Sequence, residues 1–226
     1  MNPHWLFELE SKGFVVLPDI LSASEVEMLR SQAENASGGE HAMRGLLELD
    51  WVQSLASSET VRSLIEPVLG ADCFAVRGIF FDKIPGANWL VPPHQDLSIA
   101  VEKQGEAIGY GPWSRKQGVV HVQPPREVLE KMATLRLHLD DCEESNGALR
   151  VVAGSHLIGK LSNDEILSET KRGEVIASVP EGGAMIFHPL LIHASSPSVN
   201  PLHRRVVHLE FAASELVEGL KWRWRF

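Results

Sequence analysis

Residues 134–141 read TLRLHLDD, and polar and apolar side chains alternate from Thr134 to Asp140. A period of two places the three leucines on one face of a β-strand and the arginine, histidine and first aspartate on the other. The tetrapeptide ESNG at 144–147 then favours a turn, and ALRVVAGSH at 148–156 has the apolar composition of a second strand. We therefore expect a hairpin here, and with it an antiparallel sheet.

More strands are expected on both sides of this hairpin, because short apolar or alternating runs end at turn-forming residues. They are GFVVLPD (13–19), CFAVRGIFFDKIP (73–85, ended by Pro85), GGAMIFHPLLIHAS (182–195) and RRVVHLEFAAS (204–214). Several strands that close around a site favour a jelly roll, the double-stranded β-helix of cupin-like barrels.

Helical patterns are concentrated in the first third of the chain. The run SASEVEMLRSQAENA, with Ser22 or Ser24 as its N-cap, has apolar residues at helical spacing. The run SSETVRSLIEPVLG ends at Gly70, a typical C-terminal cap. Helices followed by strands predict an α+β, mainly β fold. We expect residues 1–70 to pack as helical support on the outside of a jelly-roll core over 71–212.

Length and composition favour a single domain. The chain has 226 residues, of which 44% are hydrophobic, enough for one substantial core. The formal net charge of −9 argues against nucleic acid as a partner. Cys73 and Cys142 form no C-x-x-C pair and suggest no disulfide framework. The sequence shows neither a secretory-signal pattern nor an apolar run of the roughly 20 residues that a membrane span needs. We expect a cytoplasmic domain over 1–226 that binds a small molecule, and neither nucleic acid nor a membrane.

A candidate metal site begins in VPPHQDLSIAVE (91–102), where His94 and Asp96 stand two positions apart. Residues i and i+2 of a strand project from the same side, so both side chains can reach one ion. Because H-x-D is common by chance, the alternative is two polar residues on the wet face of a strand. His193, which ends the apolar run AMIFHPLLIH, can supply a third ligand. Two histidines and one carboxylate leave coordination positions open, as in non-haem Fe(II) oxygenases.

The spacing of these residues resembles a known family. The H-x-D motif is followed, after a long gap, by an H-x-S motif and by Arg204, eleven residues after His193. This order resembles the phytanoyl-CoA dioxygenase family over about residues 14–212, and SNGALRVVAGSH (145–156) resembles a hairpin of that family. The resemblance implies that His94, Asp96 and His193 are the catalytic iron ligands.

The same resemblance implies the contacts of the co-substrate. Arg204 matches the arginine that grips the C5 carboxylate of 2-oxoglutarate, and Ser195 matches the hydroxyl that assists it, whereas Arg205 is expected to face the surface or a helix. Arg77 and Arg136 match inward positions, where a buried arginine needs an anion, either the C1 end of 2-oxoglutarate or an acidic substrate. The alternative is that these two arginines form structural salt bridges with Asp82, Asp140 or Glu210.

The implied activity is that of an Fe(II)-, 2-oxoglutarate- and O2-dependent dioxygenase. Such an enzyme hydroxylates an unactivated C–H bond of a small metabolite and releases succinate and CO2. Related halogenases have a small residue in place of the aspartate, so Asp96 favours hydroxylation. Two other classes remain open. One is a cupin-like metalloenzyme that does not use 2-oxoglutarate, and the other is a non-catalytic sensor that binds metal and ligand without producing succinate.

Residues 103–132 fit neither period and are rich in glycine, proline and polar residues. A connection of this length is usually functional, so we expect a lid that closes over the iron. Trp113 and Lys116 are its expected substrate contacts, and the inward positions Phe81 and Lys83 extend the substrate wall. Aromatic and cationic groups together suit a small substrate with an apolar body and a carboxylate or phosphate. The alternative is a passive loop whose tryptophan packs into the core.

Three further histidines have simpler interpretations. His188 lies five residues before His193 and is expected to be structural. His156, in the GSH tripeptide, is expected to fix a turn. His208 shares its parity with Arg204 and is therefore expected to line the barrel.

Overall fold

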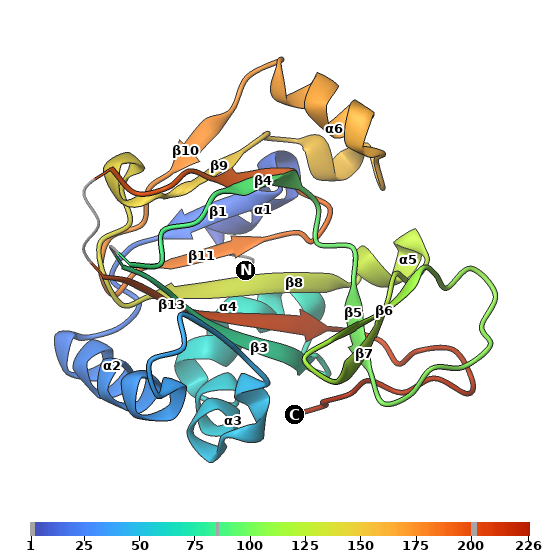
Figure 1. Ribbon diagram of the computed structural model, residues 1–226, viewed down its shortest axis with the longest axis horizontal. Coiled ribbons are helices and arrows are strands. Elements are labelled where there is room, and N and C mark those ends of the chain that lie inside the picture. Colours follow the sequence, from blue (N-terminus) through green and yellow to red (C-terminus); the bar gives the residue numbers. More distant parts are fainter. Residues whose placement is uncertain (1–2, 85, 200–202) are drawn as a thin grey trace.

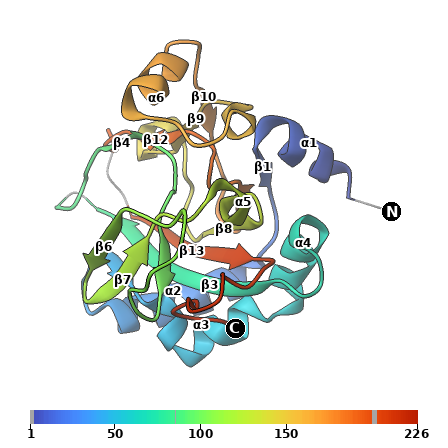
Figure 2. The same cartoon turned by 90° about the vertical axis from the view of Figure 1, so that its right-hand side faces the viewer.

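The computed structural model describes residues 3–84, 86–199 and 203–226, so Pro85, the expected end of a strand, lies outside the described residues. Within these ranges the chain forms two main antiparallel sheets, with helices on the outer surface of the larger one (Figures 1 and 2). None of the described helices combines the length and the hydropathy that a membrane crossing requires. The helices are α1 (His4–Lys12), α2 (Ala23–Ser37), α3 (Asp50–Ala56), α4 (Glu59–Leu69), α5 (Arg126–Leu129) and α6 (Asn163–Thr170).

The larger sheet is built from strands that are far apart in sequence. Its order is β1 (Phe14–Leu17), β11 (Ala184–Phe187), β8 (Met132–His138), β13 (Arg204–Ala212), β3 (Phe74–Lys83) and β2 (Ala42–Arg44). Every neighbouring pair is antiparallel. The long central strands β8, β13 and β3 present one face to the helices and the other to the smaller sheet.

The smaller sheet closes the barrel over this inner face. Its order is β10 (Val175–Ala177), β9 (Leu149–Val151), β12 (His193–Ser195) and β4 (Val91–His94). A third sheet lies beside the barrel, in the order β5 (Ile99–Val101), β7 (Val119–Val122) and β6 (Trp113–Lys116). The expected jelly roll with helices outside is therefore confirmed.

The main core lies between the larger sheet and the helices. Leu135 and Leu137 of β8 share a buried cluster with Val26 of α2 and Ile65 of α4. Helix α2 begins after Ser22, whose hydroxyl and a glutamate three residues later form a capping box. Burying each such leucine contributes about 1.5–3 kcal/mol. The leucine face of β8 thus packs against the helices, and its polar face points into the barrel.

The prediction of a hairpin over residues 134–156 is wrong. Strand β8 pairs with β11 and β13 in the larger sheet, whereas β9 pairs with β10 and β12 in the smaller one. A turn does form at Glu144–Asn146, and Gly147 follows it with a φ of 70°, but it carries the chain between sheets. Closure of a barrel gives each strand partners that are remote in sequence, and a local turn signal cannot identify them.

The expected single strand 182–195 is likewise two strands. β11 and β12 belong to different sheets, and the chain turns between them at 188–192. His188 begins this turn, where its N–H donates to the carbonyl oxygen of Gly13 at 3.0 Å and its ring stacks on His156 at 5.0 Å. These contacts support the structural interpretation of both histidines.

The segment 103–132 contains more regular structure than the sequence predicts. It forms β6, β7 and α5, and the β6–β7 hairpin is joined to the strand that follows the H-x-D motif. Gly118, with a φ of 81°, lies in the turn between β6 and β7. The segment lies beside the barrel, and its function as a lid remains a prediction.

Candidate active site

The two histidines of the candidate triad lie on neighbouring strands of the smaller sheet. His94 ends β4 and stands opposite His193, the first residue of β12, with their ring centroids 4.2 Å apart. Asp96 lies two residues beyond the end of β4 rather than on it. Its backbone N–H donates to the carbonyl oxygen of Pro189 at 2.8 Å. This bond fixes the chain so that the carboxylate meets both imidazoles.

The three side chains direct their donor atoms toward one another. One ligand atom from each lies within 4.8 Å of the others, and the two Nε2 atoms are 3.7 Å (His94) and 3.6 Å (His193) from the oxygens of Asp96. Each imidazole Nδ1 lies against the carbonyl oxygen two residues earlier, Pro92 at 2.9 Å and Leu191 at 3.0 Å. Because a carbonyl only accepts, Nδ1 carries the hydrogen and Nε2 keeps a lone pair for a metal. The donor set therefore fits Fe(II).

Charges around the triad favour the ligating protonation states. Burial raises the pKa of Asp96, but His193 and His94 beside it outweigh that effect and lower the pKa to about 2. Burial lowers the pKa of His193 to about 4, despite the attraction of Asp96. At neutral pH the site thus offers a carboxylate and a neutral imidazole, which bind a metal without first losing a proton.

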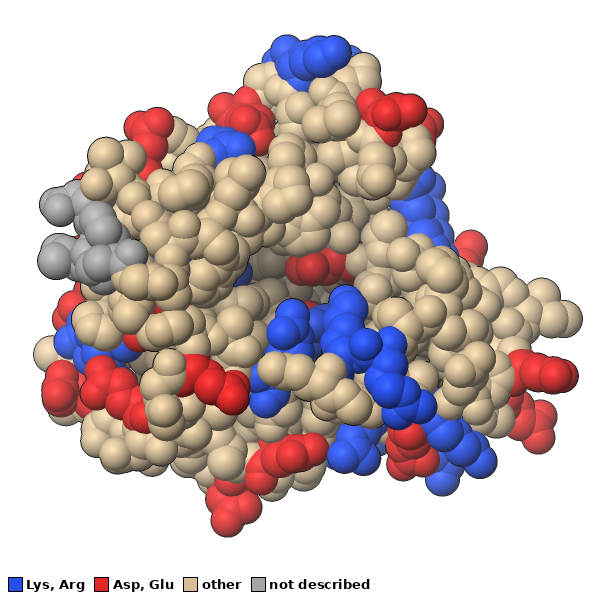
Figure 3. All heavy atoms as spheres, in the orientation of Figure 1, with Lys and Arg blue, Asp and Glu red and all other residues tan. Residues whose placement is uncertain are grey.

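A cavity of about 340 Å³ opens beside the triad, and both sheets line it. Figure 3 shows the corresponding hollow, with lysine and arginine side chains gathered on its lower rim. Its wall mixes apolar with charged side chains, which suits a small polar ligand with an apolar part. Besides the triad, its lining includes Arg44, Arg77, Ile79, Phe81, Trp89, Lys116, Arg136, Leu149, Ser195, Arg204, His208 and Glu210.

Arg204 and Ser195 meet at this cavity, as the resemblance implies. Arg204 is only 3% exposed, and its Nη1 donates to the carbonyl oxygen of Gly147 and to the Ser195 hydroxyl, the latter at 3.4 Å. Within the described residues its guanidinium forms no ion pair, and its Nε has no partner. A buried guanidinium without an acid is costly unless an anion reaches it.

Lys83 adds a second cation at the same end. It stands opposite Arg204 in the β3–β13 register and is completely buried. Its Nζ donates to the Ser195 hydroxyl at 2.8 Å and to the Ser196 carbonyl oxygen at 2.9 Å. Burial, together with the charge of Arg204, lowers the pKa of Lys83 to about 7. Lys83 therefore lies beside Arg204 and Ser195 rather than in the substrate wall expected from the sequence.

The two inward arginines differ in their partners. Arg77 forms an ion pair with Glu210 at 3.0 Å. This is one of the structural salt bridges considered as the alternative to anion binding. Arg136 forms no ion pair among the described residues, and its guanidinium lies 5.6 Å from the ring centroid of Phe81. Burial lowers the pKa of Arg136 to about 10, so it stays charged at neutral pH. Arg136 thus has the unmet charge that an anionic ligand would neutralise.

The neighbouring arginine faces away from the cavity, as expected. Arg205 pairs with Asp140 at 2.7 Å and with Glu34 of α2. Its backbone N–H also donates to Asp140 at 2.8 Å. Alternation along β13 therefore separates an inward Arg204 from a helix-facing Arg205.

The two expected lid contacts, Trp113 and Lys116, also face opposite sides of their strand. Lys116 and Phe81 line the cavity. Trp113 instead packs against an apolar cluster that includes Val122 and Trp222. This is the alternative in which the tryptophan packs into the core. Positions three apart on a strand face opposite sides, and one hairpin strand cannot present both Trp113 and Lys116 to one cavity.

Some lining residues had no signal in the sequence. Arg44 reaches the cavity from the short edge strand β2, and Trp89 reaches it from the loop before β4. Gln95, between the two motif residues, donates its Nε2 to the carbonyl oxygens of Gly159 and Leu190, both at 2.7 Å, and so holds the H-x-D loop. His208, by contrast, lines the cavity as the parity of β13 predicts.

Comparisons with known proteins agree with this geometry. The family model described as Phytanoyl-CoA dioxygenase (PhyH) matches residues 9–206. Among solved structures, AviO1 from Streptomyces viridochromogenes Tue57 is 20% identical, with a TM-score of 0.68 over 94% of this chain and 95% of that chain. EctD from S. alaskensis, in its apoform, is 18% identical, with a TM-score of 0.73 over 94% and 77%.

HygX from Streptomyces hygroscopicus, solved with nickel and 2-oxoglutarate bound, is 16% identical, with a TM-score of 0.67 over 95% of this chain and 88% of that chain. A search of curated protein sequences gave no match. At these identities the solved structures show the shared fold, and the family match spans the triad and Arg204. The chain therefore belongs to the phytanoyl-CoA dioxygenase family of Fe(II)- and 2-oxoglutarate-dependent oxygenases.

Proposed function

We propose that this protein hydroxylates an unactivated C–H bond of a small metabolite and releases succinate and CO2. The observation that carries the proposal is one cavity that holds both the convergent triad and a buried arginine, Arg204, which has no acidic partner among the described residues. Asp96 favours hydroxylation over halogenation, because its carboxylate takes the ligand position that a halide would need.

The triad would hold the metal through Nε2 of His94, one carboxylate oxygen of Asp96 and Nε2 of His193. Bound Fe(II), with 2-oxoglutarate and O2, supplies the oxidising power for this reaction. The protein keeps both imidazoles in the ligating tautomer through their backbone hydrogen bonds, and Gln95 fixes the loop between the ligands.

Arg204, Lys83 and Ser195 would bind the C5 carboxylate of 2-oxoglutarate. The guanidinium offers a planar pair of donors, the ammonium adds charge, and the hydroxyl lies within hydrogen-bond reach of both. Arg136 and Arg77 would bind a further anionic group, and Arg136 is the better candidate because Glu210 already neutralises Arg77.

Phe81, with Ile79 and Leu149, would hold the apolar part of the substrate and exclude water from it. The segment 103–132 would close over the cavity and bring Lys116 against the substrate. The hairpin position supports this lid, since Lys116 already lines the cavity from β6.

The test is turnover of the Fe(II)-loaded protein with 2-oxoglutarate and O2 across a library of small metabolites. We expect substrate-dependent succinate release and a product that gains one oxygen atom from labelled O2. A protein that binds both metal and 2-oxoglutarate but releases no succinate with any compound would be a sensor. One that binds metal, turns over a substrate and ignores 2-oxoglutarate would be a different metalloenzyme. Either result contradicts the proposal.

A further inference from the structure

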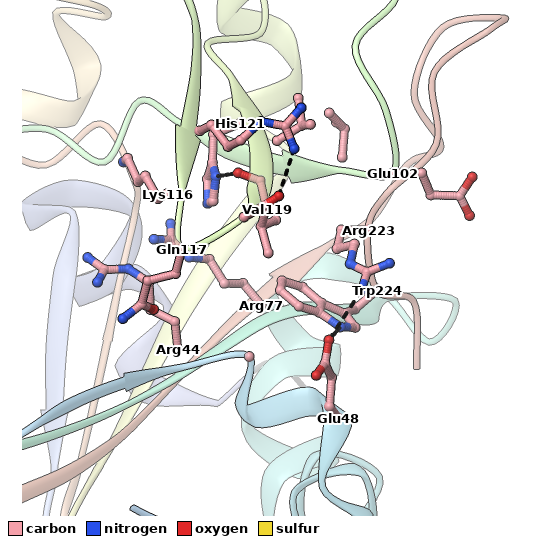
Figure 4. Close-up of a pocket in the computed structure, with 15 residues that line it drawn as sticks. Arg44, Glu48, Arg77, Glu102, Lys116, Gln117, Val119, His121, Arg223 and Trp224 are labelled. Carbon is pink, nitrogen blue, oxygen red and sulfur yellow. Dashed lines mark hydrogen bonds and ion pairs between the residues drawn. The ribbon is translucent and has the colours of Figure 1, made fainter. Parts of the chain in front are cut away.

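A second cavity of about 420 Å³ adjoins the first one on its outer side. Arg44, Arg77 and Lys116 line both cavities, so the two lie next to each other on either side of these side chains. The outer cavity lies between β2 and the β6–β7 hairpin, with the C-terminal segment as its third wall (Figure 4). A ligand held here would lie beside the cavity that contains the triad.

The outer cavity is strongly cationic, although the whole chain carries a net charge of −9. It is lined by five lysine and arginine side chains: Arg44, Arg77, Arg115, Lys116 and Arg223. Only two of them have acidic partners among the described residues. Arg77 pairs with Glu210 and Arg223 with Glu48, the latter at 3.3 Å.

The other three cations have no such neutralisation within the described part of the chain. Arg115 donates to the carbonyl oxygen of Gly118 at 2.8 Å, which holds it at the hairpin turn without cancelling its charge. Arg44 and Lys116 form neither an ion pair nor a side-chain hydrogen bond there. Figure 4 shows Arg44, Arg77 and Lys116 on one side of the cavity and Glu102, the remaining acid, on the other.

These like charges crowd one another. Burial and then the charges of Arg77 and Arg44 lower the pKa of Lys116. Burial and the charge of Arg77 lower the pKa of Arg44 in the same direction. His121 adds no charge at neutral pH, because burial lowers its pKa to about 4. An anion placed among these groups would relieve the repulsion.

The geometry points to a substrate that carries a phosphoryl group, bound by Arg44, Lys116 and Arg115 in the outer cavity while its oxidised carbon lies beside the triad. Three unneutralised cations match a dianion better than a single carboxylate. A volume within the range of small-molecule sites, about 300–1,000 Å³, favours a small metabolite over a macromolecule. The inference rests on the proposed function, whose site it completes.

The first test measures binding of inorganic phosphate by calorimetry to the wild-type protein, with and without Fe(II) and 2-oxoglutarate under argon. Filling the co-substrate site separates the outer cavity from Arg204. We expect phosphate to bind in both states. We also expect Arg44→Gln/Lys116→Gln to weaken binding at least about tenfold, and Arg172→Gln, an exposed cation on the far loop after α6, to leave it unchanged. Competition between phosphate and 2-oxoglutarate would place phosphate in the co-substrate site and overturn the assignment.

Sulfate and acetate at equal ionic strength complete this test. Sulfate should replace phosphate, and acetate should bind at least about tenfold more weakly. Equal binding of acetate would overturn the preference for a dianion. Failure of the proposed function would appear separately, as absence of 2-oxoglutarate binding or of succinate release. The phosphate titration could still be interpreted in that case.

The second test compares phosphorylated compounds with their dephosphorylated counterparts by succinate release. We expect the phosphorylated member of a pair to be the better substrate, and Arg44→Gln/Lys116→Gln to raise its KM about tenfold or more with little change in kcat. The same variant should raise the KM for the dephosphorylated compound much less, because that compound lacks the phosphoryl group. A neutral preferred substrate would overturn the inference.

Discussion

Replacing Arg204 tests the assignment of the co-substrate site most directly. The guanidinium is 3% exposed and has no acidic partner among the described residues, so a bound carboxylate would be its counter-ion. Truncating one partner of a buried, hydrogen-bonded charge pair costs about 2–5 kcal/mol. Lys83 lies against the same serine hydroxyl and would retain part of the attraction. We therefore expect Arg204→Ala to lose about 2–3 kcal/mol of binding, or about 30- to 150-fold in the Kd for 2-oxoglutarate.

The assay is an anaerobic titration of the Fe(II)-loaded protein with 2-oxoglutarate, followed by the visible absorption of the chelate. Arg204→Lys keeps the charge but loses the planar fork, so its Kd should lie between those of the wild type and the alanine variant. Arg205→Lys is the matched control, because its side chain pairs with Asp140 and Glu34 outside the cavity.

Arg204 also donates to the carbonyl oxygen of Gly147, so thermal unfolding of each variant must show that the fold survives. A folded Arg204→Ala protein whose Kd changes less than about threefold, or as little as that of Arg205→Lys, would refute the reasoning. The carboxylate would then bind elsewhere, and Arg136 would be the next buried cation to examine.

Four other outcomes are expected. His94→Ala should abolish iron binding and succinate release together, and full iron occupancy measured by metal analysis would contradict the ligand assignment. Arg136→Met should lower kcat/KM while leaving the melting temperature equal or higher, because burying an unpaired guanidinium costs stability; a large loss of stability would indicate a structural role. Gly147→Ala should destabilise the fold by about 1–2 kcal/mol in chemical denaturation, since Gly147 has a φ of 70° and a Cβ would lie 2.9 Å from the carbonyl oxygen of Ser196; unchanged stability would show that the turn can relax. Hydrogen exchange of 103–132 should slow when iron, 2-oxoglutarate and phosphate are added, and a segment already fully protected without ligands would rule out the lid.

The sequence by itself determined the local structure and the chemical identity of the site. The alternation of β8 separates the leucines that pack under the helices from Arg136 and His138, both of which are buried. The capping box at Ser22 sets the start of α2. The spacing of the two motifs and the arginine predicted a site that the structure assembles. The first two signals act within a few residues or repeat with the period of a strand, so they can be interpreted without knowing which strands pair. The spacing of the motifs could be interpreted through its resemblance to a family.

The tertiary structure decided what depends on remote neighbours. It placed β8 and β9 in different sheets, set Asp96 beyond its strand and paired Arg77 with Glu210. It left Arg136 with no acidic partner in the part of the chain that the structure describes. It also brought Arg44 from an edge strand to Lys116 on a hairpin more than seventy residues away. Whether a buried charge is neutralised or free to bind a ligand depends on which side chains surround it, and closure of the barrel alone fixes those neighbours.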